Sequence, residues 1–135
     1  MLFCAVNTSQ NIEKSQHLDA LLNGDPGLAK SKLLNRATKL IRGSSAKSAQ
    51  NSSDKSLTGK VEKVNDNTFL RLGAIPRARG AICRLNELAR TSMEDQSHLL
   101  DIMQEREFTI NKHGIKAKIR SPTSIIASAN PINRS

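Results

Sequence analysis

The fold is decided by the stretch Gly24-Asp25-Pro26-Gly27-Leu28-Ala29-Lys30-Ser31. An apolar run at 18–22 precedes it, and residues 33–41 follow it with apolar side chains at helical spacing. A strand, a glycine-containing loop, a Lys-Ser pair and a helix, in this order, form the layout of a phosphate-binding P-loop. The helix is predicted to end near Arg42-Gly43, where a glycine suits the position after the last turn.

The residue types of this loop fit the binding of a nucleotide phosphate. Small residues let backbone N–H groups surround the phosphates, and the positive end of the following helix points at them. Lys30 can reach the β- and γ-phosphates, and the Ser31 hydroxyl can ligate Mg²⁺. Ala29 stands where a second glycine is usual. A Gly-Pro turn that precedes Lys-Ser by chance is the alternative, and the flanking strand and helix argue against it.

The charge balance of the chain favours a polyanionic partner. Its 135 residues are enough for one domain with a core, and they carry a net charge of +9 with a pI of about 10.1. Nucleic acid is preferred over a membrane as this partner, and an ordinary basic protein is the alternative. Aromatic residues make up only 2% of the chain, so we expect contacts to nucleic-acid phosphates rather than base stacking.

Cys4 and Cys83 are the only cysteines. They form neither a C-x-x-C pair nor a disulfide framework, which is typical of a reducing compartment. The first six residues are too short for the apolar core of a signal peptide, and no run reaches membrane-spanning length. We therefore expect an intracellular protein with no membrane partner, in the nucleoid or cytoplasm or in the nucleus, depending on the organism.

The centre of the chain combines a low-complexity stretch with a hairpin. Residues 43–60 are rich in Ser, Ala, Lys and Asn, which indicates a flexible linker, with an anion-facing loop as the alternative. Residues 61–64 and 68–72 flank the turn cluster Asn65-Asp66-Asn67, and this predicts a β-hairpin. Residues 73–76 then break the pattern.

Polar residues follow two further predicted strands. Residues 81–87 form a buried strand ending in Asn86-Glu87, and residues 123–129 form an apolar strand followed by Asn130. In an α/β sheet the carboxyl ends of the strands face the ligand crevice. Glu87 is therefore a candidate for orienting the attacking water, with a solvated strand end as the alternative, and for Asn130 the alternative is a turn residue before proline. Arg84, inside the buried strand, needs a partner.

A capped helix and a basic hairpin lie between these two strands. Thr91-x-x-Glu94 predicts the helix start, with Ser92 and Asp95 as a second register. Residues 108–120 alternate apolar and polar positions around the turn at 112–114, which predicts a hairpin with one basic face. That face is either a solvated edge, where lysines prevent aggregation, or a surface that contacts nucleic-acid phosphates.

With these features in order, residues 18–133 resemble the AAA+ motor module of the minichromosome-maintenance (MCM) replicative helicases. The loop at 24–31 matches that family's form of the Walker A motif, and Ala29 is one of its marks. Residues 81–87 stand at its Walker B position, and Asn130 stands at sensor 1. Residues 108–120 match its pre-sensor-1 hairpin, and residues 61–72 occupy the place of its helix-2 insert hairpin. The order and spacing of the five features together are specific.

The resemblance implies an α/β fold, a P-loop NTPase (AAA+) three-layer sandwich that is incomplete and carries two inserted β-hairpins. This partial domain covers 17–135, after an N-terminal remnant at 1–16. The family forms a hexameric ring of MCM-type subunits that hydrolyses ATP with Mg²⁺ at subunit interfaces and uses both hairpins to draw DNA through a central channel. The implied site residues are 24–31 for the nucleotide, Lys30, Glu87 and Asn130 for catalysis, Ser31, Asn86 and Glu87 for Mg²⁺, and Lys112, with Lys116 and Lys118 on the same hairpin, for DNA.

Three departures from the family pattern bear on activity. The family's Walker B motif ends in Asp-Glu, whereas this chain has Asn86-Glu87, and an amide keeps a hydrogen bond but loses a charge beside the metal. Arg84 is foreign to that strand. The family's arginine finger, sensor 2, last core strand, lid and N-terminal DNA-binding domain have no counterpart up to Ser135, and an interface site needs the neighbour's arginine.

Three hypotheses follow from these observations. The first is the motor module of an ATP-dependent DNA helicase acting in DNA replication and unwinding, present as a fragment or a divergent copy. The second is a non-catalytic protein that binds nucleotide or DNA, or that modulates an intact helicase ring. The third is a truncated product without a stable fold, because an incomplete sheet leaves an open edge and exposed apolar surface.

Overall fold

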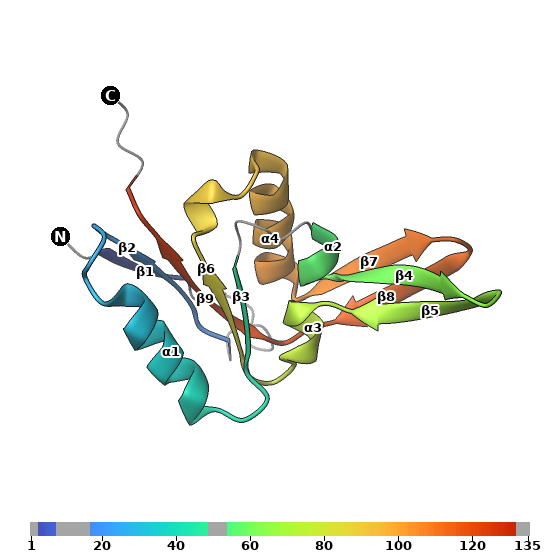
Figure 1. Ribbon diagram of the computed structural model, residues 1–135, viewed down its shortest axis with the longest axis horizontal. Coiled ribbons are helices and arrows are strands. Elements are labelled where there is room, and N and C mark those ends of the chain that lie inside the picture. Colours follow the sequence, from blue (N-terminus) through green and yellow to red (C-terminus); the bar gives the residue numbers. More distant parts are fainter. Residues whose placement is uncertain (1–2, 8–16, 49–53, 132–135) are drawn as a thin grey trace.

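The central element of the fold is a five-stranded sheet. The computed structural model describes residues 3–7, 17–48 and 54–131. The strands lie in the order β1 (Phe3–Asn7), β2 (Asp19–Asn23), β9 (Ser124–Ala129), β6 (Ile82–Asn86) and β3 (Ser45–Ser48). The last four run parallel to one another, and β1 pairs antiparallel with β2 (Figure 1).

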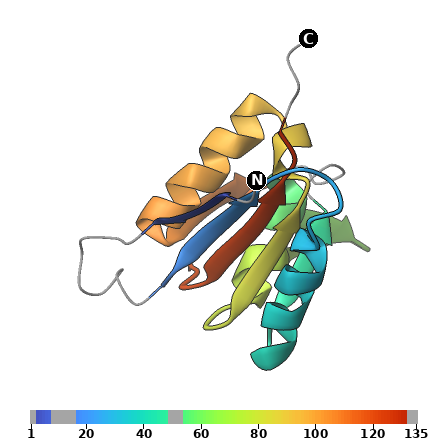
Figure 2. The ribbon, with the colours of Figure 1, turned by 90° about the vertical axis from the view of Figure 1, so that its left-hand side faces the viewer.

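Helices cover both faces of this sheet (Figure 2). α1 (Lys30–Leu40) packs on one face, where Leu34 forms a small buried cluster with Leu22 and Ile126. α4 (Met93–Glu105) and the short α3 (Ala74–Arg77) lie on the other face. A mostly parallel sheet between two helical layers confirms the predicted α/β class, and the arrangement is consistent with an incomplete P-loop NTPase fold.

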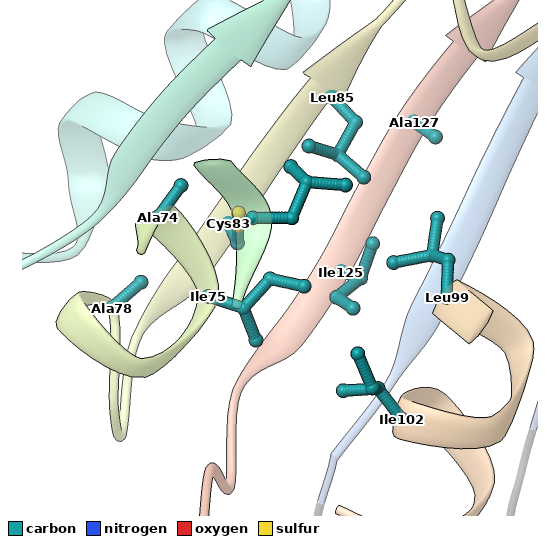
Figure 3. Packing of buried hydrophobic residues seen from close by; sticks show 10 residues of the cluster. Ala74, Ile75, Ala78, Cys83, Leu85, Leu99, Ile102, Ile125 and Ala127 are labelled. Atoms are coloured by element: carbon teal, nitrogen blue, oxygen red, sulfur yellow. The ribbon is translucent and has the colours of Figure 1, made fainter. Parts of the chain in front are cut away.

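The larger hydrophobic core lies between the sheet and the layer of α3 and α4 (Figure 3). Alternate residues of a strand point to the same face, so Cys83 and Leu85 of β6 meet Ile125 and Ala127 of β9 there. The helices contribute Ala74, Ile75, Ala78, Leu99 and Ile102. The tenth member is Leu57 of the short helix α2 (Asp54–Leu57). Because these ten side chains come from five separate segments, this core holds the strands that carry the site in a fixed register.

Two β-hairpins project side by side from one end of the sheet (Figure 1). β4 (Gly59–Val64) pairs with β5 (Asn67–Leu72), and β7 (Glu107–Lys112) pairs with β8 (Ile115–Arg120), both antiparallel. Asn65 and Asp66 both have positive φ, 48° and 62°, as a two-residue hairpin turn requires. Both predicted hairpins are confirmed.

The prediction of a flexible linker at 43–60 is wrong for the part that the structure describes. Residues 45–48 form β3, whose backbone pairs with β6 at the edge of the sheet, and Asp54–Leu57 form the short helix α2. An edge strand is held by backbone hydrogen bonds, so its Ser, Ala and Lys side chains give little apolar signal. Residues 49–53 of the predicted linker lie outside the described residues.

Residues 73–76 break the hairpin pattern as predicted, but they also start a helix that the sequence did not indicate. α3 places Ile75 at 0% exposure in the core. Gly73 is required just before it, because a Cβ there would lie 2.4 Å from the carbonyl group of Leu57. A single helical turn built around a proline is too short to show helical periodicity.

α4 begins at the second of the two predicted capping registers. Ser92 Oγ accepts a hydrogen bond from the Asp95 backbone N–H at 3.1 Å and donates one to the Asp95 carboxylate at 2.7 Å. Leu99 and Ile102 then face the core, whereas Leu100 is exposed. The helix is therefore amphipathic, and its buried face covers β6 and β9.

The predicted division between a remnant at 1–16 and a domain at 17–135 stays a prediction, because residues 8–16 lie outside the described part. β1, at 3–7, is a strand of the same sheet. Among the described residues there is no helix that is both long enough and apolar enough to cross a membrane.

Candidate nucleotide site

The loop at 24–29 joins the carboxyl end of β2 to the first turn of α1. Two of its residues adopt left-handed backbone conformations, Gly27 with φ of 87° and Ala29 with φ of 55°. The Gly24 N–H donates to the Ala129 carbonyl at 3.4 Å, which ties the loop to the end of β9. The loop therefore curls over the edge of the sheet and leaves the amino end of α1 open to a ligand.

A cavity of about 510 Å³ lies at this edge of the sheet. It is lined by Pro26, Gly27, Leu28, Ala29, Lys30, Ser31, Lys32, Glu87, Ser128, Ala129 and Asn130. The carboxyl ends of β2, β6 and β9 meet here because these strands are parallel neighbours. Glu87 and Asn130, predicted from separate parts of the sequence, thus share one cavity with Lys30 and Ser31.

Lys30 is a buried cation at the wall of this cavity. It is only 7% exposed, and its Nζ donates to the carbonyl oxygens of Gly24 at 2.5 Å and Asp25 at 2.6 Å. Gly24 and Asp25 do not line the cavity themselves, so their part is to hold the ammonium group. Carbonyl oxygens are neutral acceptors, and phosphate oxygens can take their place with a stronger, charge-assisted hydrogen bond. The residues present therefore fit a nucleotide phosphate.

Glu87 follows β6 in a left-handed conformation, with φ of 60° and ψ of 40°. Its Oε1 lies 3.9 Å from Nη1 of Arg90, in the short 3₁₀ helix Leu88–Arg90. This conformation turns the chain sharply at the end of the strand, which is unfavourable for a residue with a Cβ and is typical of functional sites. The carboxylate is consequently near the cavity rather than in line with the buried strand.

The residues proposed for Mg²⁺ are not equally placed. Ser31 and Glu87 line the cavity, whereas Asn86 does not, and the Asn86 Oδ1 is buried without a hydrogen-bond partner. Within the described residues no group of three or more His, Cys, Asp or Glu side chains is arranged to hold a metal ion. A hydroxyl and one carboxylate fit a Mg²⁺ ion that also binds phosphate, with fewer charged ligands than an Asp-Glu pair would supply.

Arg84 lies on the same face of β6 as Asn86, because alternate residues of a strand share a face. Its Nε is buried without a hydrogen-bond partner. The sequence indicates that a buried Arg84 needs a partner, and its Nε atom has none among the described residues. The strand nevertheless keeps its place between β9 and β3.

The three hairpin lysines lie apart from this cavity, on β7 and β8. All are exposed. Lys118 forms an ion pair with Glu107 at 2.8 Å, whereas a contact with the Lys55 side chain, and the positive charge of that group, lower the pKa of Lys112. The structure brings Lys112 close to α2, a contact for which the sequence contained no signal.

Lys32, Ser128 and Ala129 line the cavity and were missed from the sequence. Lys32 directly follows the Lys-Ser pair, and Ser128 and Ala129 directly precede Asn130. Their adjacency to predicted site residues, at the ends of the same elements, is the signal by which they could be found.

A phosphate-binding loop at the carboxyl edge of a parallel sheet defines the class of P-loop nucleotide-binding domains. The family described as MCM P-loop domain matches residues 1–135. The chain belongs to the MCM family.

Relatives from several eukaryotes agree with this family. The chain is 32% identical over 117 residues to "DNA replication licensing factor mcm7" of Schizosaccharomyces pombe, a match that covers 85% of the chain and 15% of that protein. It is 34% identical over 124 residues to "DNA replication licensing factor MCM4" of Drosophila melanogaster, covering 90% of the chain and 14% of the relative. The chain therefore spans only about 15% of the length of the relatives it matches.

Proposed function

We propose that this chain is the ATP- and DNA-binding motor module of an MCM-type DNA helicase that acts in DNA replication and unwinding. Other MCM-type subunits and DNA are its proposed partners. The observation that carries the proposal is the shared cavity, in which Lys30 and Ser31 of the loop lie with Glu87 and Asn130 from two other strands. The names of the relatives, all DNA replication licensing factors, support the process.

Each proposed role follows from the chemistry of a side chain. Lys30 exchanges its two carbonyl acceptors for oxygens of the β- and γ-phosphates, and the amino end of α1 adds its dipole. Glu87 accepts a hydrogen bond from the attacking water and so orients it, while Arg90 holds the carboxylate from the other side. Asn130 donates its amide N–H to the phosphate end of the nucleotide.

Mg²⁺, when bound, neutralises charge that develops on the phosphate oxygens. Ser31 and Glu87 are the proposed ligands of this chain, and Asn86 can offer only a neutral amide oxygen. The chain is thus better equipped to bind ATP than to hydrolyse it.

A non-catalytic role is the second candidate, and the Asn86 position favours it. A chain that binds nucleotide or DNA without turnover could occupy or modulate a ring of intact MCM-type subunits. Asn86 does not line the cavity, and among the residues that the structure describes the cavity lining includes Lys30 and Lys32 but no arginine. An arginine from a neighbouring subunit is the usual source of the missing charge in interface sites.

Measurement of ATP turnover with and without intact MCM-type subunits tests the motor proposal. We expect the purified chain to bind ATP and to contribute turnover only when the other subunits are present, and Glu87→Gln to remove that contribution. Binding without any added turnover in the presence of the partners would overturn the motor role in favour of the non-catalytic one. Failure of the chain to bind ATP at all would overturn the motor role and the nucleotide-binding form of the second candidate, and would leave only a chain that binds DNA or the ring itself.

A further inference from the structure

We propose that Lys32 is a second phosphate-binding cation of the nucleotide site, and that with Lys32 in place the site binds the polyphosphate of ATP without depending on Mg²⁺. The inference rests on the proposed function, since it takes a nucleotide as the ligand of the cavity beside the loop at 24–31. It adds to the site a residue outside the Lys-Ser pair. It also gives that residue part of the charge that Mg²⁺ supplies in a site with an Asp-Glu pair.

Lys32 lies in the first turn of α1 and lines the cavity together with Lys30 and Ser31. The two lysines differ in the contacts that they must give up to bind a phosphate. Lys30 is buried, and its ammonium group has to leave the carbonyl oxygens of Gly24 and Asp25. Lys32 is exposed, and within the described residues it has neither a carboxylate partner nor a hydrogen-bond acceptor. A phosphate therefore displaces no protein group from Lys32.

The amino end of α1 carries positive charge that no acidic side chain of the same turn compensates. The first turn contains no Asp or Glu, and the N-cap residue, Ala29, provides no side-chain hydrogen bond to the free N–H groups. The helix dipole already makes this end positive, so a lysine there is unfavourable until an anion binds. Because Lys30 and Lys32 add two cations to the same end, a polyanionic ligand stabilises the whole arrangement.

The charged residues of the cavity lining leave an excess of positive charge. They are Lys30, Lys32 and Glu87, so two cations face one carboxylate. Asp25 belongs to the loop but does not line the cavity. Asn86 adds no charge at the end of β6, where an aspartate would supply a second carboxylate. A site with this balance attracts phosphates directly, whereas paired carboxylates repel them unless a metal ion lies between.

The charge of the ligand gives the role of Lys32 a specific signature. ATP without Mg²⁺ carries more negative charge than its Mg²⁺ complex, and the attraction of one cation grows with the charge of its partner. Loss of Lys32 should therefore weaken the binding of free ATP more than the binding of the Mg²⁺ complex. A lysine with only a structural role would affect both equally, because the protein is the same in both titrations.

Titration of the full chain with a fluorescent ATP analogue, once with Mg²⁺ and once with a chelator in its place, tests the proposal. We expect the affinities of the unaltered chain to differ by less than about threefold between the two conditions. Lys32→Ala should lose at least about fivefold with the chelator and clearly less with Mg²⁺, whereas Lys32→Arg should keep most of the affinity in both. Arg36→Ala is the matched control and should bind as the unaltered chain does. It removes an exposed cation one turn further along the same helix, outside the cavity lining.

The possible outcomes separate this proposal from the proposed function. Equal affinities of Lys32→Ala and the unaltered chain with the chelator would overturn the role of Lys32 and leave the nucleotide site intact. Binding of the unaltered chain that disappears with the chelator would overturn the independence from Mg²⁺. No binding of the unaltered chain in either condition would overturn the nucleotide part of the proposed function, and this inference with it.

Thermal unfolding without nucleotide distinguishes a binding role of Lys32 from a structural one. Lys32→Ala should be at least as stable as the unaltered chain, since the change removes a cation from the positive end of α1. A marked loss of stability would overturn the proposal in favour of a structural role.

Discussion

Arg106 and Asp19 form a buried, bidentate ion pair. Arg106 Nη1 lies 3.1 Å from Asp19 Oδ1, and Arg106 Nη2 lies 2.5 Å from Asp19 Oδ2, with the side chains 8% and 1% exposed. Asp19 opens β2, whose other end carries the P-loop, and Arg106 stands between α4 and β7. The ion pair therefore joins the strand that leads into the loop at 24–31 to the base of the β7–β8 hairpin.

The first prediction concerns the stability that depends on this pair. Asp19→Ala or Arg106→Met alone should lower the free energy of unfolding by about 3–5 kcal/mol, because each leaves a buried charge without its partner. Asp19 Oδ1 also accepts from the Ile125 N–H at 2.8 Å, which adds to the loss in Asp19→Ala. Urea unfolding followed by circular dichroism measures the change. A double change of Asp19→Leu with Arg106→Met should recover part of it.

The exposed pair Lys63–Asp66 is the control for this experiment. Lys63→Ala should cost less than about 1 kcal/mol, since solvent screens a surface pair. Equal costs for the buried and the exposed pair would show that the Arg106–Asp19 contact does not hold the fold together.

The second prediction is a pH dependence of stability near His17. Burial and the Arg106 cation lower the pKa of His17 from 6.5, and the Asp19 carboxylate acts in the opposite direction. The unfolded chain therefore binds more protons at this site, so stability rises with pH up to about 6.5 and falls as pH decreases below it. His17→Asn should flatten this part of the stability curve. An unchanged slope in the variant would assign the dependence to other groups.

The third prediction concerns the reactivity of Cys83. Burial raises the pKa of its thiol, and the residue is 0% exposed in the core. In a Cys4→Ser background, modification by a thiol reagent at pH 8 should be slower than in urea by a factor on the order of 10², because the folded chain must open first. Rapid labelling of the folded chain would contradict the packing of β6 against α3.

The fourth prediction concerns the Walker B position. Asn86→Asp should increase the Mg²⁺-dependent part of ATP affinity several-fold, because it returns a carboxylate beside Glu87. Without a ligand the same variant should be less stable than the unaltered chain, since a buried carboxylate has to be desolvated. Thermal shifts with ATP and Mg²⁺, and with ATP and a chelator, separate the two effects. An equal thermal shift under both conditions in the variant would show that position 86 does not reach the metal.

The elements that the sequence predicts well are those specified by local patterns. The helix after Lys30, the hairpin around Asn65-Asp66 and the start of α4 at Ser92 each depend on residues within a few positions of one another. β3 and α3 could not be predicted in this way. β3 is held by pairing with β6, and α3 by packing in the core, and both depend on segments distant in the sequence.

In the candidate site, too, some features follow from local sequence patterns and others depend on contacts between distant segments. Lys30, Ser31, Glu87 and Asn130 could be expected to meet because the carboxyl ends of parallel strands share one edge of a sheet. The absence of Asn86 from the cavity lining depends on which face of β6 it occupies, and a strand pattern alone does not fix that face. The Arg106–Asp19 pair joins residues 87 positions apart, and no local signal marks it.

Nucleotide binding by Lys30→Ala tests the central claim most directly. Titration of the chain with a fluorescent ATP analogue measures the affinity, and Lys39→Ala, in the last turn of the same helix, is the control. We predict that Lys30→Ala weakens binding by at least about tenfold, or ~1.4 kcal/mol, and that Lys39→Ala does not. Equal affinity of the unaltered chain and Lys30→Ala would contradict the assignment of the loop at 24–31 as the nucleotide site.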